Sequence, residues 1–243
     1  MFRIQHHDQT DSTNDDAAKL LGEPHAAGLV LTADYQRAGR GRHARPWVAP
    51  PGSSLLCTAI LPATVRSDGL WAVTFWAGLA VADAIEAASG LRAGLVWPND
   101  LTLGGRKCCG VLCVSRVAGE FAWVGCGTGI NVVRPAGDAE LAALDPPPAF
   151  LSDYEPQIDR SQLLAELLAA YERRLPELND PEGIARQWQR RAELNGKRYL
   201  LAVDGEAEPF SATARRIAPG GGLVVERDGA ERTIALADAR VLR

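Results

Sequence analysis

Residues 121–133 read FAWVGCGTGINVV, a β-prone run in which every second residue from Gly125 to Gly129 is glycine. We predict a strand here. Alternate glycines in a strand indicate that something packs closely against one of its faces, and a flat ligand is one candidate. The run contains neither a G-x-G-x-x-G turn ahead of a helix nor a G-x-x-x-x-G-K-[ST] loop. A nucleotide, if this chain binds one, is therefore held by other means.

The residues before this run predict the rest of a β-meander. Leu95-Val96-Trp97 forms a short strand that Pro98-Asn99-Asp100 breaks. The turn Gly104-Gly105 then joins residues 101–103 to a longer strand over 107–115. Neighbouring strands in this part of the chain are therefore expected to run antiparallel.

Helices are predicted on both sides of the meander in the sequence. Residues 10–16 hold N-cap residues and acids that suit the first turn of a helix. The alanine-rich segment 71–88 is long and apolar enough for a buried helix, and leucines spaced i, i+3, i+4 after Ser161 predict an amphipathic one. The remaining predicted elements are strands over 28–33 and 55–61 and a helix around 183–194.

The sequence changes character after Asn195-Gly196. Short β-prone pieces there alternate with turns such as Asp204-Gly205 and Asp228-Gly229. The pieces cover residues 198–203, 210–217, 223–227 and 232–236. We predict a small β-barrel that must dock on a larger partner, because about fifty residues bury little core of their own. The expected domains are residues 1–194 and 195–243.

Composition narrows the class of protein. A formal net charge of -4 over 243 residues gives no general attraction to nucleic acid or to anionic membrane. The five cysteines form no C-x-x-C pair and the four histidines lack metal-ligand spacing, so neither a disulfide framework nor a His or Cys metal site is expected. We find no signal sequence and no uninterrupted apolar run of membrane-spanning length. We expect a cytoplasmic protein that binds neither DNA nor membrane.

The stretch Gly39–Trp47, GRGRHARPW, belongs to a long loop over residues 36–54. Loops of this length inside a compact domain are usually functional or mobile. Arginine presents a planar fork of donors that suits phosphate and carboxylate, and the glycines beside Arg40 permit close approach of the backbone to a ligand. Trp47 can stack on a nucleobase. Taken alone, the run fits a solvated basic loop or an RNA-binding segment just as well.

A second group of polar residues follows the predicted strand at 95–97. Asn99 and Asp100 lie where that strand breaks, so their side chains can reach into a pocket, and Asp100 can help to hold magnesium bound to phosphates. Lys107 begins an otherwise apolar strand and can pair with a phosphate. Ordinary turn chemistry and a lysine facing water explain these residues equally well when each is taken alone.

Together, these motifs resemble those of the biotin protein ligase family. The resemblance rests on Asp11-Ser12-Thr13-Asn14; on Gln36, Gly39-Arg40-Gly41-Arg42 and Arg45-Pro46-Trp47; on Trp97-Pro98-Asn99-Asp100, Lys107 and Gly110; and on Gly127-Thr128-Gly129-Ile130-Asn131. Their order and spacing agree with the family over roughly residues 8–135. The resemblance implies an α+β fold, in which a central mixed or antiparallel sheet of the class II synthetase-like type is flanked by helices and followed by a small SH3-like β-barrel.

The resemblance also implies a reaction in two steps. Biotin and MgATP form biotinyl-5′-AMP and pyrophosphate, and the acyl group then passes to a lysine of a biotin carboxyl carrier domain. The implied biotin-binding residues are Ser12, Thr13, Asn14, Gln36, Arg40, Gly41, Arg42, Lys107, Gly110 and Gly127. The implied ATP- or adenylate-binding residues are Arg42, Arg45, Trp47, Asn99, Asp100, Lys107 and Asn131, with Asp100 serving Mg²⁺. Lys107, Arg40 and Arg42 are the expected catalytic residues.

Two positions depart from the family pattern. Val96 stands where the family commonly has lysine, and Ala44 stands where many members have glycine. We expect altered affinity or rate rather than loss of the reaction. Only ten residues precede Asp11, so a monofunctional ligase without the N-terminal DNA-binding domain is expected, and analogy with the family allows a homodimer.

Three other interpretations stay open at this point. A lipoate or octanoate ligase or transferase has the related fold, but the run of three glycines typical of its acyl site occurs here only at 220–222, in the tail. A non-catalytic protein that binds biotin or a nucleotide would be consistent with Val96. RNA binding through residues 37–45 is disfavoured by the acidic net charge and the lack of interleaved aromatic residues.

Overall fold

The computed structural model describes residues 1–137, 141, 143–237 and 239–242, and its largest element is an eight-stranded sheet. Its strands follow the order β1-β2-β3-β8-β7-β6-β5, and β4 pairs with β8 off this path. The strands are β1 (Arg3–Thr10), β2 (Leu29–Gln36), β3 (Ser54–Ile60), β4 (Val65–Arg66), β5 (Gly94–Val96), β6 (Asp100–Leu103), β7 (Arg106–Ala118) and β8 (Phe121–Asn131). β1 pairs with β2 in parallel and the other neighbours are antiparallel, so the predicted mixed sheet and its meander are confirmed.

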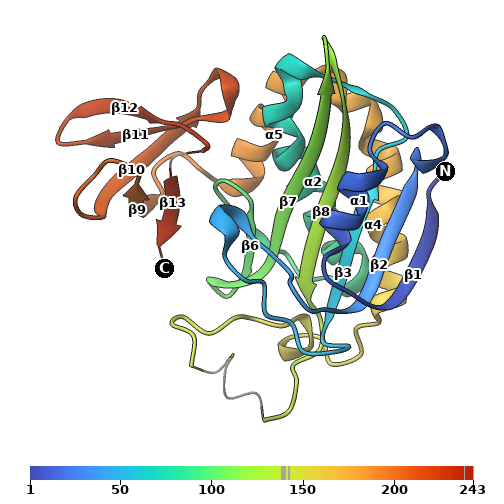
Figure 1. The fold of residues 1–243 in the computed structure, drawn as a ribbon. Helices are drawn as coiled ribbons and strands as arrows, with labels where there is room; N and C mark the ends of the chain where they lie inside the picture. Colours follow the sequence, from blue (N-terminus) through green and yellow to red (C-terminus); the bar gives the residue numbers. More distant parts are fainter. Residues whose placement is uncertain (138–140, 142, 238, 243) are drawn as a thin grey trace.

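Helices cover both faces of this sheet (Figure 1). The short α1 (Thr13–Leu20) lies on one face, over β2, β3, β7 and β8. On the other face lie α2 (Leu70–Ser89), α4 (Arg160–Arg174) and α5 (Pro181–Ala192), and α2 packs between α4 and α5. The predicted helices are therefore present, and the sheet separates α1 from the other three.

The apolar composition of α2 explains its central position. A helix that is apolar on all sides is stable only where protein surrounds it. Trp76 stacks on Tyr171 of α4 with ring centroids 4.9 Å apart, and Phe75 meets Trp188 of α5 at 5.1 Å. Among the described residues, the span Ser67–Ser89 is long and apolar enough to cross a membrane, but 67% of its apolar window is buried inside the protein. We conclude that it is a core helix.

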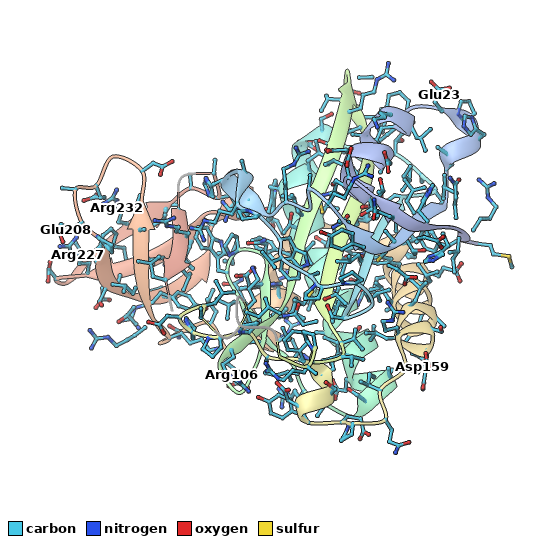
Figure 2. The ribbon with its side chains drawn as sticks, turned by 60° about the horizontal axis from the view of Figure 1, so that its bottom comes forward. Glu23, Arg106, Asp159, Glu208, Arg227 and Arg232 are labelled. Atoms are coloured by element: carbon cyan, nitrogen blue, oxygen red, sulfur yellow. The ribbon has the colours of Figure 1, made fainter. Side chains whose placement is uncertain are left out.

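A five-stranded antiparallel sheet follows α5, in the order β12-β11-β10-β9-β13. Its strands are β9 (Arg198–Val203), β10 (Phe210–Ile217), β11 (Leu223–Arg227), β12 (Ala230–Ile234) and β13 (Ala239–Leu242). Figure 2 labels Arg227 and Arg232 at the outer end of this sheet, where their guanidinium groups lie 4.6 and 5.8 Å from the centroid of the Phe210 ring. Its inner end shares one continuous apolar core with the helices.

A hydrogen bond inside this core links the residue that follows β5 to the turn that precedes β11. Trp97, which is 1% exposed, donates its indole Nε1–H to the carbonyl of Gly221 at 3.2 Å. The small sheet therefore docks on the larger part of the chain, as its size requires. The predicted boundary near residue 195 falls between the end of α5 and the start of β9. The division into two domains stays a prediction.

The strands that the sequence did not predict are two edge strands and the two-residue β4, which pairs with one end of β8. β1 and β13 were not predicted, and the strand expected over 232–236 lies at Ala230–Ile234. β1 reads RIQHHDQT and is mostly exposed, so it shows no alternation of apolar and polar residues. Its strand conformation comes from pairing with the buried β2, and tertiary pairing of this kind leaves no local pattern.

The cysteines behave as core residues. All five are free thiols, as expected for a chain without a disulfide framework. Burial raises the pKa of Cys57 to about 12. The hydrogen bond with Cys113 and burial together raise the pKa of Cys126 well above the usual range. A thiol held in its protonated form is a poor nucleophile, so neither residue is suited to covalent catalysis.

We predict that Trp97→Phe lowers the free energy of unfolding by about 1–2 kcal/mol, because the buried carbonyl of Gly221 loses its donor. Chemical denaturation followed by circular dichroism measures the loss. Trp123→Phe is the matched control, since Trp123 is only partly buried, beneath Arg116. An equal loss in the two variants would contradict the importance of this hydrogen bond.

Candidate functional site

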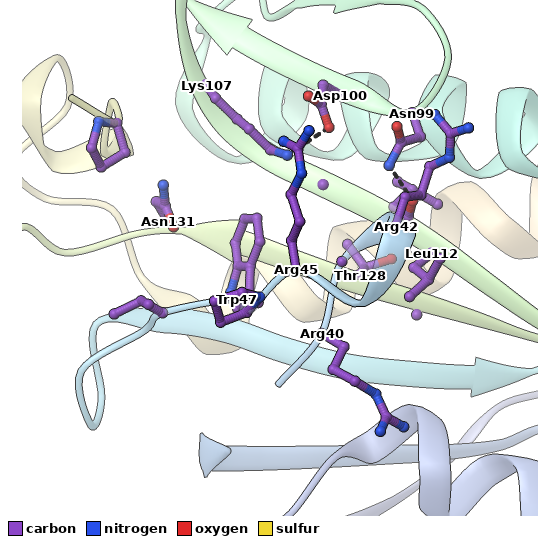
Figure 3. A pocket seen from close by; sticks show the side chains of 18 of the residues that line it. Arg40, Arg42, Arg45, Trp47, Asn99, Asp100, Lys107, Leu112, Thr128 and Asn131 are labelled. Atoms are coloured by element: carbon purple, nitrogen blue, oxygen red, sulfur yellow. Dashed lines mark hydrogen bonds and ion pairs between the residues drawn. The ribbon is translucent and has the colours of Figure 1, made fainter. Parts of the chain in front are cut away.

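A pocket of about 710 Å³ opens on the face of the large sheet that carries α1 (Figure 3). Its volume lies within the range typical of small-molecule sites. Its walls come from the start of α1, from β7 and β8, from the loop between β2 and β3, and from β13 of the small sheet. Elements far apart in the sequence therefore meet at one cavity.

Every residue that the sequence assigned to the site lines this pocket. They are Ser12, Thr13, Asn14, Gln36, Arg40, Gly41, Arg42, Arg45, Trp47, Asn99, Asp100, Lys107, Gly110, Gly127 and Asn131. The individual roles given to them remain predictions. Their contacts divide them into a polar end near α1, a cationic end near β6 and β7, and a loop that closes one side.

The floor of the pocket is the glycine-bearing face of β8. A Cβ atom on Gly127 would lie 2.2 to 2.6 Å from the side-chain amide of Asn14, and one on Gly129 would lie 2.7 to 3.0 Å from the Trp47 ring. Gly125, two residues earlier, lies beneath Ala17 of α1. The alternate glycines therefore let the helix and the loop approach the strand more closely than any side chain would allow.

Hydroxyl and amide groups form the polar end. The backbone N–H and the hydroxyl of Thr13 both donate to Gln36 Oε1, at 2.8 and 3.0 Å. Asn14 Nδ2 donates to the carbonyl of Leu112 at 2.9 Å, and its Oδ1 accepts from Thr58 Oγ1 at 2.8 Å. These contacts fix the orientation of each amide, so the polar end is rigid before any ligand arrives.

Lys107 and Asp100 form the centre of the cationic end. Lys107 Nζ lies 2.7 Å from Asp100 Oδ1 and 5.4 Å from the centroid of the Trp47 ring. Asn99 Nδ2 donates to the carbonyl of Val111 at 2.8 Å, which ties the break after β5 to β7. The Arg45 side chain extends from the loop toward this end of the pocket (Figure 3). An anion bound here would meet several cationic groups.

Residues 39–47, which we call the arginine loop, form the closing side of the pocket. Arg42 donates to two main-chain carbonyls, that of Leu236 in the connection after β12 and, at 3.2 Å, that of Ala239 at the start of β13. Burial lowers the pKa of Arg42, although its ordinary value is high enough that the guanidinium stays charged. Arg40 points away from Lys107 and forms an ion pair with Asp15 on α1 (Figure 3). In this conformation, therefore, both guanidinium groups contact protein atoms.

Trp47 places its indole ring on the floor of the pocket. Its Nε1–H is buried and has no acceptor among the described residues. A buried donor without a partner is costly, so this position of the ring leaves one hydrogen bond unmade. The ring also covers Gly110, whose Cβ would lie 3.1 Å from it. Trp47 therefore fits a role as a wall for a flat ligand.

The two departures from the family pattern occupy different places. Ala44 adopts left-handed backbone geometry with φ 54°, as does the neighbouring His43. Glycine takes this conformation without the steric cost that a Cβ brings, roughly 1 kcal/mol per residue. Val96 lies on β5 opposite Asp100 of β6 and packs partly against the core. A lysine at this position would therefore be a neighbour of Asp100.

Several lining residues were not found by sequence reasoning. Behind the lining, Thr58 is fully buried in β3 and donates to Asn14, and no motif revealed it. The small sheet adds Leu200, Arg240, Val241 and Leu242, and the segment after β8 adds Leu141, Leu144, Asp145, Pro146 and Pro148. These residues reach the pocket only because the small sheet and the segment after β8 pack against the large sheet, and no local sequence pattern predicts that packing.

Within the part of the chain that the structure describes, the histidine nearest to a carboxylate lies away from the pocket. His6 Nε2 is 3.5 Å from Asp34, whose carboxylate already pairs with Arg160.

The fold and the pocket define a protein that binds a small molecule with a polar end and an anionic end. Residues 7–131 match the model of the biotin/lipoate A/B protein ligase family. The chain belongs to this family.

Similar proteins cover most of the chain. The biotin–[acetyl-CoA-carboxylase] ligase of Mycobacterium tuberculosis is 30% identical over 244 residues, which cover 97% of this chain and 87% of that protein. The ligase of the same name from Paracoccus denitrificans is 33% identical over 208 residues, covering 82% and 85%. The biotin protein ligase of Aquifex aeolicus, solved in complex with biotin and ATP, superposes with a TM-score of 0.79 at 21% identity and covers 99% of each chain. The chain spans only 52% of the bifunctional ligase/repressor of Bacillus subtilis.

We predict that Gly129→Ala displaces the indole of Trp47 from the floor of the pocket, because the new Cβ would lie inside the ring's contact distance. Tryptophan fluorescence should then show increased quenching by acrylamide. The same substitution in a Trp47→Phe background is the control and should leave quenching unchanged. If both backgrounds respond equally, the change arises from another tryptophan.

Proposed function

We propose that this chain is an ATP-dependent biotin protein ligase. It forms biotinyl-5′-AMP from biotin and MgATP and then transfers biotin to a lysine of a biotin carboxyl carrier domain. The observation that carries the proposal is a single pocket in which a rigid set of amides and hydroxyls leads directly to a cationic end. The names of the similar proteins from Mycobacterium tuberculosis and Paracoccus denitrificans support the same activity.

The polar end suits the ureido ring of biotin. A ureido group presents two N–H donors and one carbonyl acceptor in a plane, and Thr13, Asn14 and Gln36 offer both kinds of partner around one position. The ring of Trp47, which lies on Gly129, gives this pocket a flat apolar surface against which a ring system can pack. The hydrocarbon end of octanoate or lipoate offers neither a donor nor an acceptor to this polar end, so it gains no hydrogen bond there, which disfavours the rival substrates.

The cationic end suits the first chemical step. A carboxylate oxygen of biotin bonds to the α-phosphorus of ATP, and the bond from that phosphorus to the bridging oxygen of pyrophosphate breaks. The two reactants are anions that repel each other, so Lys107, Arg42 and Arg45 must neutralise charge as the new bond forms. Lys107 is already held near this position by Asp100. Reaction requires that Lys107 exchange at least part of that contact for the anion.

The residues of the pocket also fit a magnesium ion. Magnesium keeps several waters and takes one or two protein carboxylates together with substrate phosphates, and Asp100 supplies such a carboxylate at the cationic end. When bound, the ion would stabilise charge on the pyrophosphate that leaves. Asn131 is 5% exposed and donates to the carbonyl of Ala149, so it fixes the segment beside the nucleotide end rather than supplying charge.

The second step needs a shielded intermediate. The amine of the carrier lysine attacks the carbonyl carbon of the adenylate, and the bond from that carbon to the phosphate oxygen breaks, so AMP leaves. Until then the mixed anhydride must be kept from water, and the arginine loop is placed to cover it. A cytoplasmic location and a homodimer remain predictions.

We predict that the purified chain releases pyrophosphate from MgATP with biotin and not with lipoate or octanoate. Lys107→Ala should slow this release by orders of magnitude, because the cationic end loses a group that would neutralise charge on the α-phosphate. Lys19→Ala, on the surface of α1, is the matched control. Pyrophosphate release with lipoate or octanoate but not with biotin would show that the substrate is one of those acids. No release with any of the three acids would favour a non-catalytic binding protein. A wild-type rate in Lys107→Ala would remove Lys107 from the mechanism.

We also predict that Gly127→Ala weakens the binding of biotin by at least about tenfold, since the Cβ displaces the amide of Asn14. Isothermal titration calorimetry measures the affinity for biotin and, separately, for ATP, which should change little. Cys126→Ala, on the opposite face of the same strand, controls for loss of stability. Unchanged biotin affinity in Gly127→Ala would place the acyl group elsewhere.

A further inference from the structure

The arginine loop is built as a short hairpin. Trp47 N–H donates to the carbonyl of Gly39 and Gly41 N–H donates to that of Arg45, both at 2.8 Å. Arg40 and Pro46 form an isolated bridge between the two arms. Because the arms are tied to each other, the loop can move as one unit about its root.

The root of the loop is fixed by the main chain. Arg37 N–H donates to the carbonyl of Thr10 and Ala38 N–H to that of Asp11, both at 2.9 Å. From Gly39 onward, the side chains of three described residues tie the loop to the rest of the protein. Their contacts are the ion pair of Arg40 with Asp15, the hydrogen bonds of Arg42 to the small sheet, and the packing of Trp47 on the floor. The position of the loop over the pocket therefore depends on these contacts.

Asp15, the partner of Arg40, lies on α1, the helix that also carries Thr13 and Asn14 of the polar end. It lies in the first turn of α1, where its N–H is 3.4 Å from Ser12 Oγ, and it directly follows Asn14. Thr13 and Asn14 orient the amide cluster of the pocket from the same turn. The ion pair thus connects the loop to the helix turn that contacts the acyl group under the proposed function.

We propose that Asp15 is a positioning residue that keeps the arginine loop closed over the acyl-adenylate by holding Arg40. This inference rests on the proposed function for the identity of the ligand. The side chains of Arg40 and Asp15 are 49% and 38% exposed, so water and salt weaken the pair. Loss of this ion pair should therefore shorten the lifetime of the closed loop by about three- to fivefold, not by orders of magnitude.

The chain offers a closely matched control for this role. Asp16 is the next residue of α1 and also carries an ion pair, with Lys19 at 3.0 Å, and it contacts Thr10 rather than the arginine loop. Asp15→Asn and Asp16→Asn remove the same charge from the same helix turn. Any general effect of charge on α1 or on its dipole appears in both variants.

The first measurement is the rate at which biotinyl-5′-AMP leaves the enzyme when no carrier is present. Asp15→Asn should speed its release by about three- to fivefold over wild type and over Asp16→Asn, with the rate of adenylation unchanged. Asp15→Asn combined with Arg40→Gln should release adenylate no faster than Arg40→Gln alone. Equal release from Asp15→Asn and Asp16→Asn, or a further increase in the double variant, would overturn the proposal.

A second measurement needs no ligand. Trypsin cleaves after Arg42 only when the loop leaves the protein surface, so the initial rate of this cleavage reports opening. Asp15→Asn should be cut several-fold faster than Asp16→Asn, and equal rates would contradict the role of Asp15 as an anchor. If wild type forms no adenylate while this difference in cleavage is present, the proposed function fails and the anchor stands.

Discussion

Gly125, Gly127 and Gly129 leave the middle of one face of β8 without Cβ atoms, and α1 and the arginine loop lie directly on that part of the strand. This close approach sets the depth of the pocket, because Asn14 and Trp47 occupy space that side chains on β8 would otherwise fill. It also brings the first turn of α1 to the centre of the sheet, where Thr58 and the carbonyl of Leu112 orient the side-chain amide of Asn14. The contacts of the polar end and the position of the loop therefore both depend on the absence of side chains at these three positions of β8.

The two ends of the pocket use different interactions to bind a ligand. The polar end is fixed by short hydrogen bonds between neutral groups, so it selects a ligand by the pattern of its donors and acceptors. At the cationic end, Lys107 forms an ion pair with Asp100. This pair holds the lysine in place and leaves neither partly buried charge without a partner. The small sheet completes the site, because its main-chain carbonyls hold Arg42 at the tip of the loop. An acid and a nucleotide can meet here only when all of these elements are docked.

Much of this arrangement could be predicted from the sequence, because its motifs have local physical causes. The break at Pro98-Asn99-Asp100, the apolar segment that became α2, and the spaced glycines of β8 were each visible in composition and spacing. The exposed β1 and the terminal β13 were not predicted, since only their neighbours make them strands. The residues of the small sheet line the pocket only because that sheet packs against the rest of the chain, and no local pattern marks Thr58, which orients Asn14 from β3. The direction of Arg40, toward Asp15 and away from Lys107, likewise depends on where α1 lies and not on the motif that contains it.

The central claim is that one pocket selects biotin and activates it as an adenylate. The most direct test incubates the chain with MgATP and an equimolar mixture of biotin, lipoate and octanoate, separates the protein from free ligand, and identifies the retained small molecule by mass spectrometry after denaturation. The account predicts biotinyl-5′-AMP, bound at about one molecule per chain and absent from Lys107→Ala. Retention of a lipoyl or octanoyl adenylate, or of biotin without any adenylate, would contradict it.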